Sequence, residues 1–487
     1  MKNTQKKRKG ATTRLFVEVP KRLKDVAILV VLGYLTLLFF VTFQNTNPVP
    51  FTIVRLLAVL AYVIISSSPL WYPRKDIGLF HPLYLIAGFT FIKSTIPNTR
   101  VWSEGVSQHP ALPGWTEQSV SLLHVKIIML QCLSWICILL GYQLSKGVRW
   151  RFLQFRDKHR INLVGAIFCF FIGLFCLYQL LALSGGLDAH LKNIARGFAA
   201  KRWVGDAQYA SVYAALIPMS IALPAILILS LKKPFLNPMT WGTMAVAVVA
   251  SYLVNGRRSA VVIAVLVFTA CWLLRRRSLA IGRLAMIGLV GFAMIGILGE
   301  FRRSNWTNRS VDFTVFQELD LELALVNSLE ELESRNEAGA NFPIVGLVPS
   351  KVGFLYGRNY FDYINRFIPR LFWPDKPRGI GIECAEVFYG RYDKGGIPPG
   401  ALGEAYWSGG VIGVVIIFFC WGMVLKSIGN IFLRFSQSSV ACLLYLATIG
   451  TLGPSEPQFR AWLYLVGPLV LVLMIFGILK VRFARKN

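Results

Sequence analysis

Apolar stretches alternate with short polar segments along the whole chain of 487 residues. Each stretch is close to the roughly 20 residues that an α-helix needs to cross a bilayer, and the seventh and eighth are the shortest. The pattern therefore predicts an all-α polytopic membrane protein with about 12 transmembrane helices. The predicted spans are 26–44, 51–70, 77–95, 121–143, 161–182, 209–230, 239–255, 259–274, 281–299, 407–425, 437–453 and 461–479.

Charge is distributed unequally between the two sides that these spans define. With the N-terminus in the cytoplasm, the inner segments carry 29 Lys and Arg against 4 Asp and Glu, whereas the outer segments carry 23 against 20. Because basic residues near span ends remain cytoplasmic, both termini are predicted to be cytoplasmic. The resulting regions are a basic N-terminus (1–25), spans 1–9 with short loops (26–300), one large outer loop (301–406), spans 10–12 (407–480) and a cytoplasmic tail (481–487).

Composition supports a membrane protein and excludes several other classes. The chain is 55% hydrophobic, with a mean hydropathy of +0.54, which a soluble domain would not need. Its net charge of +28 lies mostly in short inner loops that face anionic lipid, so no nucleic-acid partner is expected. The basic N-terminus precedes a span that is too long for a cleaved signal peptide, and we interpret that span as a retained signal anchor.

The eight cysteines do not form a disulfide framework. Seven lie inside predicted spans, where they act as small apolar packing residues, and only Cys384 falls in an outer loop. The sequence has no CxxC, no HExxH and no cluster of Cys and His. We therefore expect no structural metal, and the outer arginines described below would make a divalent metal unnecessary for activity.

The large outer loop is predicted to be folded, since it holds 12 basic and 14 acidic residues in near balance. Residues 313–333 place apolar side chains at helical spacing with acids opposite, which predicts an amphipathic helix. Residues 361–372 predict a second one, rich in aromatics and arginine, along the membrane surface. A loop of this size between membrane helices is usually functional.

Two arginines in a tight outer turn, Arg257 and Arg258, oppose the positive-inside rule. The guanidinium group is a planar, permanently charged fork that suits phosphate oxygens, and the preceding Gly256 lets the backbone approach a ligand closely. This pattern favours an anionic-ligand site. The alternative is a hairpin whose arginines reach up to the lipid headgroups.

Other basic residues gather at the same outer height, where they would form a cationic basin for a lipid pyrophosphate. A charge at membrane depth is costly and usually faces a cavity or a partner. Each residue alone also fits a headgroup anchor. These residues are Arg55, Lys93, His124, Lys126, Arg302, Arg303 and Arg460.

The outer loop 183–207 offers a second basic segment. Lys192 and Arg196 are four residues apart and share one face of a helix. His190, Lys201 and Arg202 add to it, and Trp203 could stack on a sugar ring. The segment is either an anion-binding or sugar-binding arm or a solvated amphipathic helix.

The end of the large loop carries the candidate acid–base chemistry. Glu404 lies at the mouth of span 10, where partial burial would suit a general base near neutral pH, and Asp375 is the rival carboxylate. Arg370 and Lys376 flank Asp375 as candidate contacts for pyrophosphate or glycan. The alternative for Glu404 is a structural hydrogen bond to a helix N-terminus.

Four pieces of this pattern resemble one family, the oligosaccharide repeat unit polymerases, or Wzy-type O-antigen polymerases. They are the multi-span architecture with its Gly-Gly…Arg loop at 185–196, the NGRRSA turn, IPRLFWPDKP at 368–377 and IPPGALGEAYWSGGVIGVV at 397–415. The last two are the most specific, and the resemblance covers about residues 160–480.

The resemblance implies a fold similar to C-type lipid-dependent glycosyltransferases in the bacterial inner membrane, with a periplasmic active site. The implied reaction moves a growing glycan from undecaprenyl pyrophosphate to a new lipid-linked repeat unit, without a nucleotide. The family's functional arginines would correspond to Arg196 or Arg202, and to Arg257 or Arg258, where the doubling departs from the pattern. The same pathway implies a flippase and a chain-length regulator as partners.

Three alternative functions remain open. One is a non-enzymatic membrane scaffold, which would not need basic residues on the outer side. An O-antigen ligase uses the same donor but usually carries a catalytic histidine in its large loop, and residues 301–406 contain none. A flippase or transporter predicts repeats and ionisable residues near mid-membrane, whereas the span centres here are nearly free of charge.

Overall fold

The computed structural model describes about two thirds of the chain, and the account below concerns these residues only. The described residues are 50–71, 80–90, 112, 114–148, 153–155, 158–196, 207–256, 258–276, 337–365, 368, 373, 377–390, 396–435 and 438–481. The predicted spans 26–44 and 281–299 and the predicted amphipathic helix 313–333 lie outside them.

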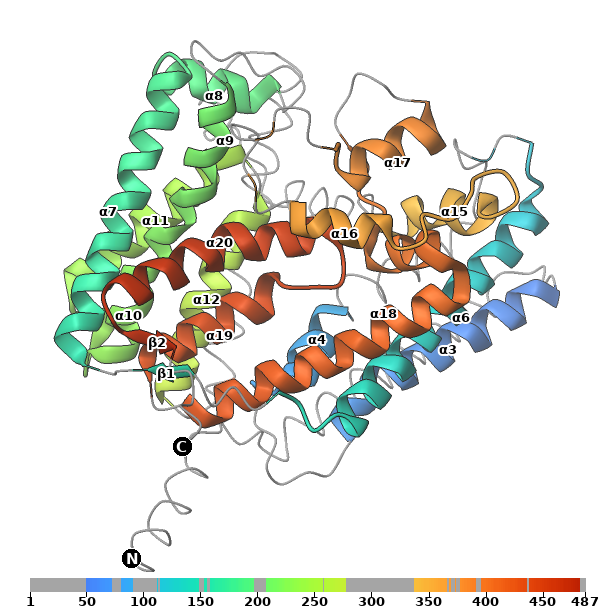
Figure 1. Cartoon of the computed structure of the whole chain (residues 1–487), viewed down its shortest axis with the longest axis horizontal. Helices are drawn as coiled ribbons and strands as arrows, with labels where there is room; N and C mark the ends of the chain where they lie inside the picture. The colour runs from blue at the N-terminus through green and yellow to red at the C-terminus, as the bar shows by residue number, and fades with distance from the viewer. Residues whose placement is uncertain are drawn as a thin grey trace, which may run out of the picture.

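Helices dominate the described chain, and one two-stranded pairing accompanies them (Figure 1). In chain order the elements are α3 (Pro50–Trp71), α4 (Pro82–Thr90), α6 (Glu117–Leu144), β1 (Leu153–Phe155), α7 (His159–Leu183), α8 (Leu187–Arg196), α9 (Ala207–Leu216), the 3₁₀ helix η3 (Ile217–Ile221), α10 (Ala222–Ser230), η4 (Pro234–Leu236), α11 (Pro238–Asn255), α12 (Arg258–Arg276), α15 (Glu337–Leu347), α16 (Arg358–Asn365), α17 (Ile380–Tyr389), α18 (Gly400–Phe435), α19 (Ser439–Thr451), α20 (Glu456–Ile475) and β2 (Leu479–Val481).

Five of the described helical segments are long and apolar enough to cross a membrane. Shorter apolar helices occupy four more of the predicted spans, and α4 lies inside another. These findings agree with an all-α membrane protein. The five long segments are Gln118–Leu144, His159–Leu183, Val212–Ser230, Gly400–Phe435 and Glu456–Ile475.

The long helices expose apolar side chains in stripes. On α7 the exposed residues Val164, Phe168, Phe171, Phe175 and Tyr178 recur at intervals of three and four, so they lie along one face. A continuous apolar stripe of this kind is unfavourable in water and is typical of a surface that faces lipid.

Side-chain caps fix where several of these helices begin. The backbone N–H of Ser119 donates to Thr116 at the start of α6, and the N–H of Met239 donates to Asn237 at the start of α11. Ser438 caps α19 in the same way. Each cap satisfies a backbone donor that the first helical turn leaves without an intrahelical partner.

The central packing is between α6 and α18, which approach each other at glycines. A β-carbon on Gly141 would stand 2.1 Å from the carbonyl oxygen of Phe419, and one on Gly422 would stand 2.2 Å from that of Ile138. Small residues let the two backbones approach closely, which is how membrane helices gain van der Waals contact.

Helix α18 is broken near its start. Gly409 (φ −172°, ψ 32°) and Gly410 (φ 61°, ψ −141°) are not helical, so a half-helix at 400–408 precedes a long helix at 411–435. The predicted span 407–425 therefore begins inside the half-helix and stops ten residues before α18 ends. The bounds of α16 also differ from the predicted helix 361–372. This helix begins three residues earlier, at Arg358, and ends at Asn365.

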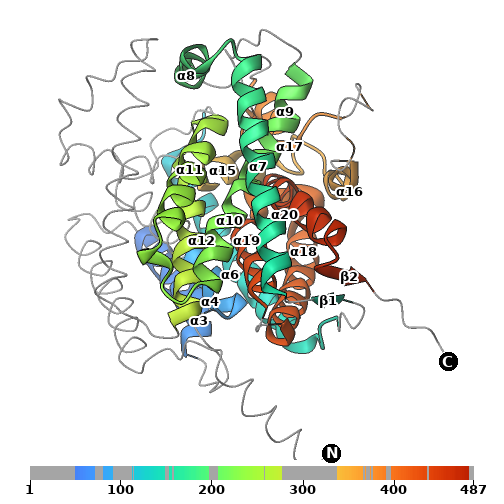
Figure 2. The same cartoon turned by 90° about the vertical axis from the view of Figure 1, so that its left-hand side faces the viewer.

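The two ends of the helical bundle differ in what they carry. In both views α8 and α17 lie at the upper end, whereas the β1–β2 pair lies at the lower end (Figures 1 and 2). We call the end with α8, α15, α16 and α17 the loop end. The antiparallel pair joins Gln154 to Lys480, and both belong to segments that the charge pattern assigns to the inner side.

Candidate functional site

Glu404 lies at the loop end, inside the half-helix of α18, and its side chain is fully buried (0% exposed). Its carboxylate accepts hydrogen bonds from the backbone N–H of Glu456, with N···O distances of 3.1 Å to Oε1 and 2.9 Å to Oε2. The Tyr363 hydroxyl donates to Oε2 over 2.5 Å. The sequence predicted partial burial of Glu404, whereas the side chain is fully buried. Helices α16, α18 and α20 surround its carboxylate.

The contact with Glu456 places Glu404 at the N-terminus of α20. Glu456 is the first residue of that helix, and Pro457 follows it. The first turn of a helix has backbone N–H groups without intrahelical partners and a partial positive charge, so an anionic side chain is stabilised there. The sequence analysis gave a structural hydrogen bond to a helix N-terminus as the alternative role of Glu404. The structure has this geometry, and the helix is α20.

Tyr363 is held between two of these elements. Its ring stacks on Phe459 of α20, with centroids 5.2 Å apart and planes at 16°, while its hydroxyl reaches Glu404 of α18. Burial first, and then the negative charge of Glu404, raise the pKa of Tyr363 far above its ordinary value. The hydroxyl therefore stays protonated and acts as a donor to the carboxylate.

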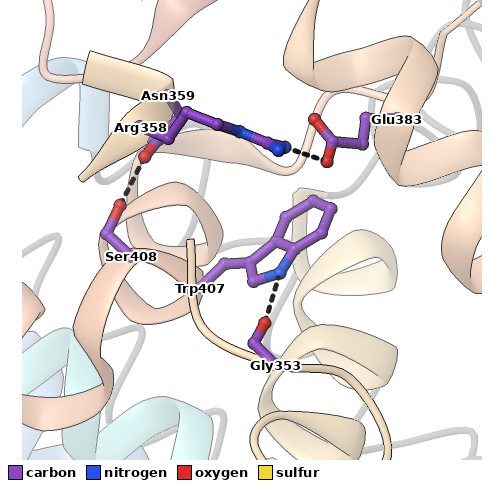
Figure 3. A network of polar contacts seen from close by, with 6 residues as sticks. All are labelled: Gly353, Arg358, Asn359, Glu383, Trp407 and Ser408. Carbon is purple, nitrogen blue, oxygen red and sulfur yellow. Dashed lines mark hydrogen bonds and ion pairs between the residues drawn. The ribbon is translucent and has the colours of Figure 1, made fainter. Parts of the chain in front are cut away.

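A second hydrogen bond joins the same two helices one turn away. The Ser408 hydroxyl donates to Asn359 Oδ1 over 2.6 Å (Figure 3). Asn359 and Tyr363 are four residues apart on α16, and Glu404 and Ser408 are four residues apart on α18. Each pair lies on one face of its helix, so the two hydrogen bonds bind α16 to the half-helix along one antiparallel seam.

The loop before α16 closes the broken end of the half-helix. The backbone N–H of Leu355 donates to the carbonyl of Trp407 over 2.9 Å, and the Trp407 indole donates to the carbonyl of Gly353 over 3.2 Å (Figure 3). Phe354 contacts Gly410, since a β-carbon there would stand 3.3 Å from its ring. The Trp407 carbonyl, beside the break, thus finds a donor within the protein.

Helix α17 is attached to α16 and to its own approach segment by ion pairs. Arg358 pairs with Glu383 (Figure 3), and Arg378 pairs with Glu386 at 2.5 Å. Both arginines are more than half exposed, so each pair contributes little to stability. Cys384 is buried on the same helix, and burial followed by the charge of Glu404 raises the pKa of its thiol to about 12, which makes the thiol unreactive.

Two basic residues of the predicted basin have described partners inside the protein. Lys126 on α6 donates to the Tyr406 hydroxyl (3.1 Å) and to the carbonyl of Val345 (3.4 Å). Arg460 on α20 lies 3.6 Å from Glu456 Oε1. Lys126 therefore ties α6 to α15 and α18, while the Arg460 side chain is 44% exposed beside the Glu404 site.

The two arginine-bearing segments of the prediction lie next to each other at the α8 and α11–α12 junction. Gly256 has a φ of +62°, and a β-carbon there would stand 2.1 Å from Ile194 Cγ2. His190 Nε2 donates to the carbonyl of Leu253 over 2.6 Å, which also holds α8 against the end of α11. Helix α8 ends at Arg196, two residues after Ile194, and α12 begins at Arg258, two residues after Gly256, so each position is two residues from this contact.

The predicted amphipathic character of 183–207 is seen in α8. Lys192 forms an ion pair with Asp188 one turn earlier, at 2.6 Å. His190 and Ile194 are buried against α11, so the helix has one packed face and one solvated face.

Several predicted site residues lie outside what the structure describes. Asp375, Arg370, Lys376, Arg202 and Arg257 are among them, and for Arg55, Arg196 and Arg258 only the backbone is described. Among the described residues, no group of three or more His, Cys, Asp and Glu is placed to hold a metal ion.

The sequence reasoning missed Tyr363, Asn359 and Ser408. The available signal was the matched spacing of four residues on each helix, but it does not reveal that α16 and α18 meet. Comparison with protein-family models, curated proteins and solved structures finds no match to this chain.

Proposed function

We propose that this protein polymerises lipid-linked oligosaccharide repeat units. In this proposal it transfers the growing glycan from undecaprenyl pyrophosphate to the non-reducing end of a new lipid-linked repeat unit. It does so as a protein of about twelve spans in a bacterial inner membrane, with both termini in the cytoplasm and the loop end in the periplasm. The resemblance of the NGRRSA, IPRLFWPDKP and GALGEAYWSGG segments to the Wzy-type polymerases is the starting point.

The observation that carries the proposal is the contact between Gly256 and Ile194. It joins two basic segments, from separate loops, that the resemblance marks as functional. A pyrophosphate carries several negative charges, and binding it takes more than one permanently charged donor. A junction that holds the end of α8 at Arg196 and the start of α12 at Arg258 within two residues of one contact supports such a site better than two separate headgroup anchors would.

This reaction requires the protein to stabilise the leaving group and to accept a proton. An acceptor hydroxyl attacks the anomeric carbon, the bond from that carbon to the pyrophosphate oxygen breaks, and the hydroxyl proton leaves. Arginines placed beforehand around the leaving group stabilise its growing negative charge, often the largest single catalytic contribution. A carboxylate accepts the proton. No nucleotide and no metal is required in this scheme.

Glu404 and Asp375 are the two candidates for that carboxylate. A helix N-terminus and a tyrosine hydroxyl both donate to Glu404, and such donors favour the ionised form of a carboxylate. Its side chain is fully buried, and Tyr363 is one of the groups that cover it. Asp375 lies in the IPRLFWPDKP segment that follows α16.

Reconstitution in liposomes tests the function directly. Purified protein is supplied with a synthetic undecaprenyl-pyrophosphate repeat unit, and the products are separated by length. A polymerase gives a ladder and releases one undecaprenyl pyrophosphate per bond formed. Transfer of single units to lipid A core would indicate a ligase instead, and movement of the lipid across the bilayer without bond formation would indicate a flippase.

A further inference from the structure

The seam between α16 and the half-helix of α18 fixes the Glu404 carboxylate from two directions. The backbone N–H of Glu456 donates to it from α20, and Tyr363 donates from α16. Tyr363 is itself fixed by stacking on Phe459, and the Asn359–Ser408 hydrogen bond holds α16 in register. The carboxylate thus has one defined orientation.

We infer that Tyr363 is a positioning residue, which orients the Glu404 carboxylate and keeps it ionised for proton transfer from an acceptor sugar hydroxyl. The inference rests on the proposed function, with Glu404 as the base. Tyr363 cannot itself be the base, because its hydroxyl remains protonated in these surroundings. Its contribution is geometric and electrostatic, and it acts only through Glu404.

The groups around the carboxylate decide how its charge responds to pH. Tyr360 and Tyr363 approach from α16, and burial followed by the charge of Glu404 raises the pKa of Tyr360 well above its ordinary value. Cys384 approaches from α17, and Glu456 with Arg460 lies on α20. Tyr363 is the side chain that donates directly to the carboxylate among the hydrogen bonds described above.

The test compares Tyr363→Phe with the wild-type protein in the liposome reaction. The phenylalanine ring keeps the stack on Phe459 and removes only the hydroxyl. We expect kcat to fall by roughly 10–100-fold, since a misplaced catalytic group costs about that much, while KM for the lipid-linked unit changes less than about threefold. The acid limb of the pH–rate profile should move to higher pH, because the ionised carboxylate loses a donor.

Tyr356→Phe is the matched control. Tyr356 is 83% exposed on the loop before α16, and losing its hydroxyl should change neither kcat nor the pH profile. Thermal midpoints of Tyr363→Phe, Glu404→Gln and the double variant provide a second readout that needs no turnover. If the two side chains are coupled, the double variant should lose less than the sum of the two single losses.

The outcomes separate this inference from the proposed function. A wild-type protein that makes no polymer overturns the proposed function, and this inference with it. Polymer from the wild type, together with an unchanged kcat and pH profile for Tyr363→Phe, overturns the inference alone. A lower kcat with an unmoved pH profile also overturns it, because a merely structural role of Tyr363 gives that result whether or not the thermal losses are additive.

Discussion

Gly256 lies so close to Ile194 that a β-carbon at position 256 would stand 2.1 Å from Ile194 Cγ2. The contact joins the turn between α11 and α12 to α8, and Ile194 lies 62 residues before Gly256 in the chain. Gly256 also has a φ of +62°, the left-handed conformation that glycine adopts without strain. Both properties require glycine at this position.

Replacing Gly256 with alanine should therefore separate the two arginine-bearing segments. We expect Gly256→Ala to destabilise the protein by roughly 2–4 kcal/mol, from backbone strain and the contact with Ile194, and to reduce polymer synthesis. Gly242→Ala on the same helix is the matched control, since nothing lies within 4 Å of its added β-carbon. Thermal unfolding in detergent measures the stability of both variants. Equal midpoints for Gly256→Ala and Gly242→Ala would contradict the prediction.

The arginine turn should need guanidinium groups and not merely positive charge. Changing Arg257 or Arg258 to lysine keeps the charge but removes the bidentate fork, so we expect at least one variant to lose roughly 10–100-fold in activity, about 1.4–2.7 kcal/mol. Arg434→Lys, at the far end of α18, serves as the control. If both lysine variants build polymer of full length, the turn only anchors the hairpin to headgroups.

Glu404→Gln keeps the size of the side chain and removes its charge. If Glu404 is the general base, this variant should make polymer roughly 10²–10⁴-fold more slowly than the wild type. If Glu404 only caps helix α20, loss of its charge should cost about 1 kcal/mol in the free energy of unfolding, and activity should fall only as far as stability does. Asp375→Asn is measured in parallel, and normal ladders from Glu404→Gln with loss of activity from Asp375→Asn would assign the base to Asp375.

The close approach of α6 and α18 should make their glycines intolerant of any side chain. Gly141→Ala and Gly422→Ala each place a β-carbon near 2 Å from a carbonyl oxygen of the facing helix. We expect each variant to lose about 1–3 kcal/mol in thermal unfolding. Gly450→Ala on α19 has nothing within 4 Å and should be neutral, so a comparable loss there would show that glycine itself, and not this interface, is responsible.

Topology has its own test. The charge pattern places residues 301–406 outside, so reporter fusions at Ser310 and Gly395 should be active only with an enzyme that works in the periplasm. Both positions lie outside the described residues. Cytoplasmic reporter activity at either position would reverse the assignment of sides, and the proposed reaction would lose its location.

The sequence by itself determined where helices form. A continuous apolar stretch satisfies its own backbone hydrogen bonds only as a helix when it is surrounded by lipid, and this local rule needs no knowledge of neighbours. The ranges 121–143 and 161–182 accordingly lie within α6 and α7. The break in α18 was not predicted, although its Gly-Gly pair is visible in the sequence, because glycine permits a break without requiring one.

The tertiary structure decided which side chains meet. The sequence singled out Glu404 and named a helix N-terminus as its alternative partner, but only folding brings it to Glu456 and Tyr363, 52 and 41 residues away. The same holds for Ile194 and Gly256. Spacing along one helix fixes which residues share a face, whereas the facing helix is chosen by packing over the whole bundle, and that choice has no local signal.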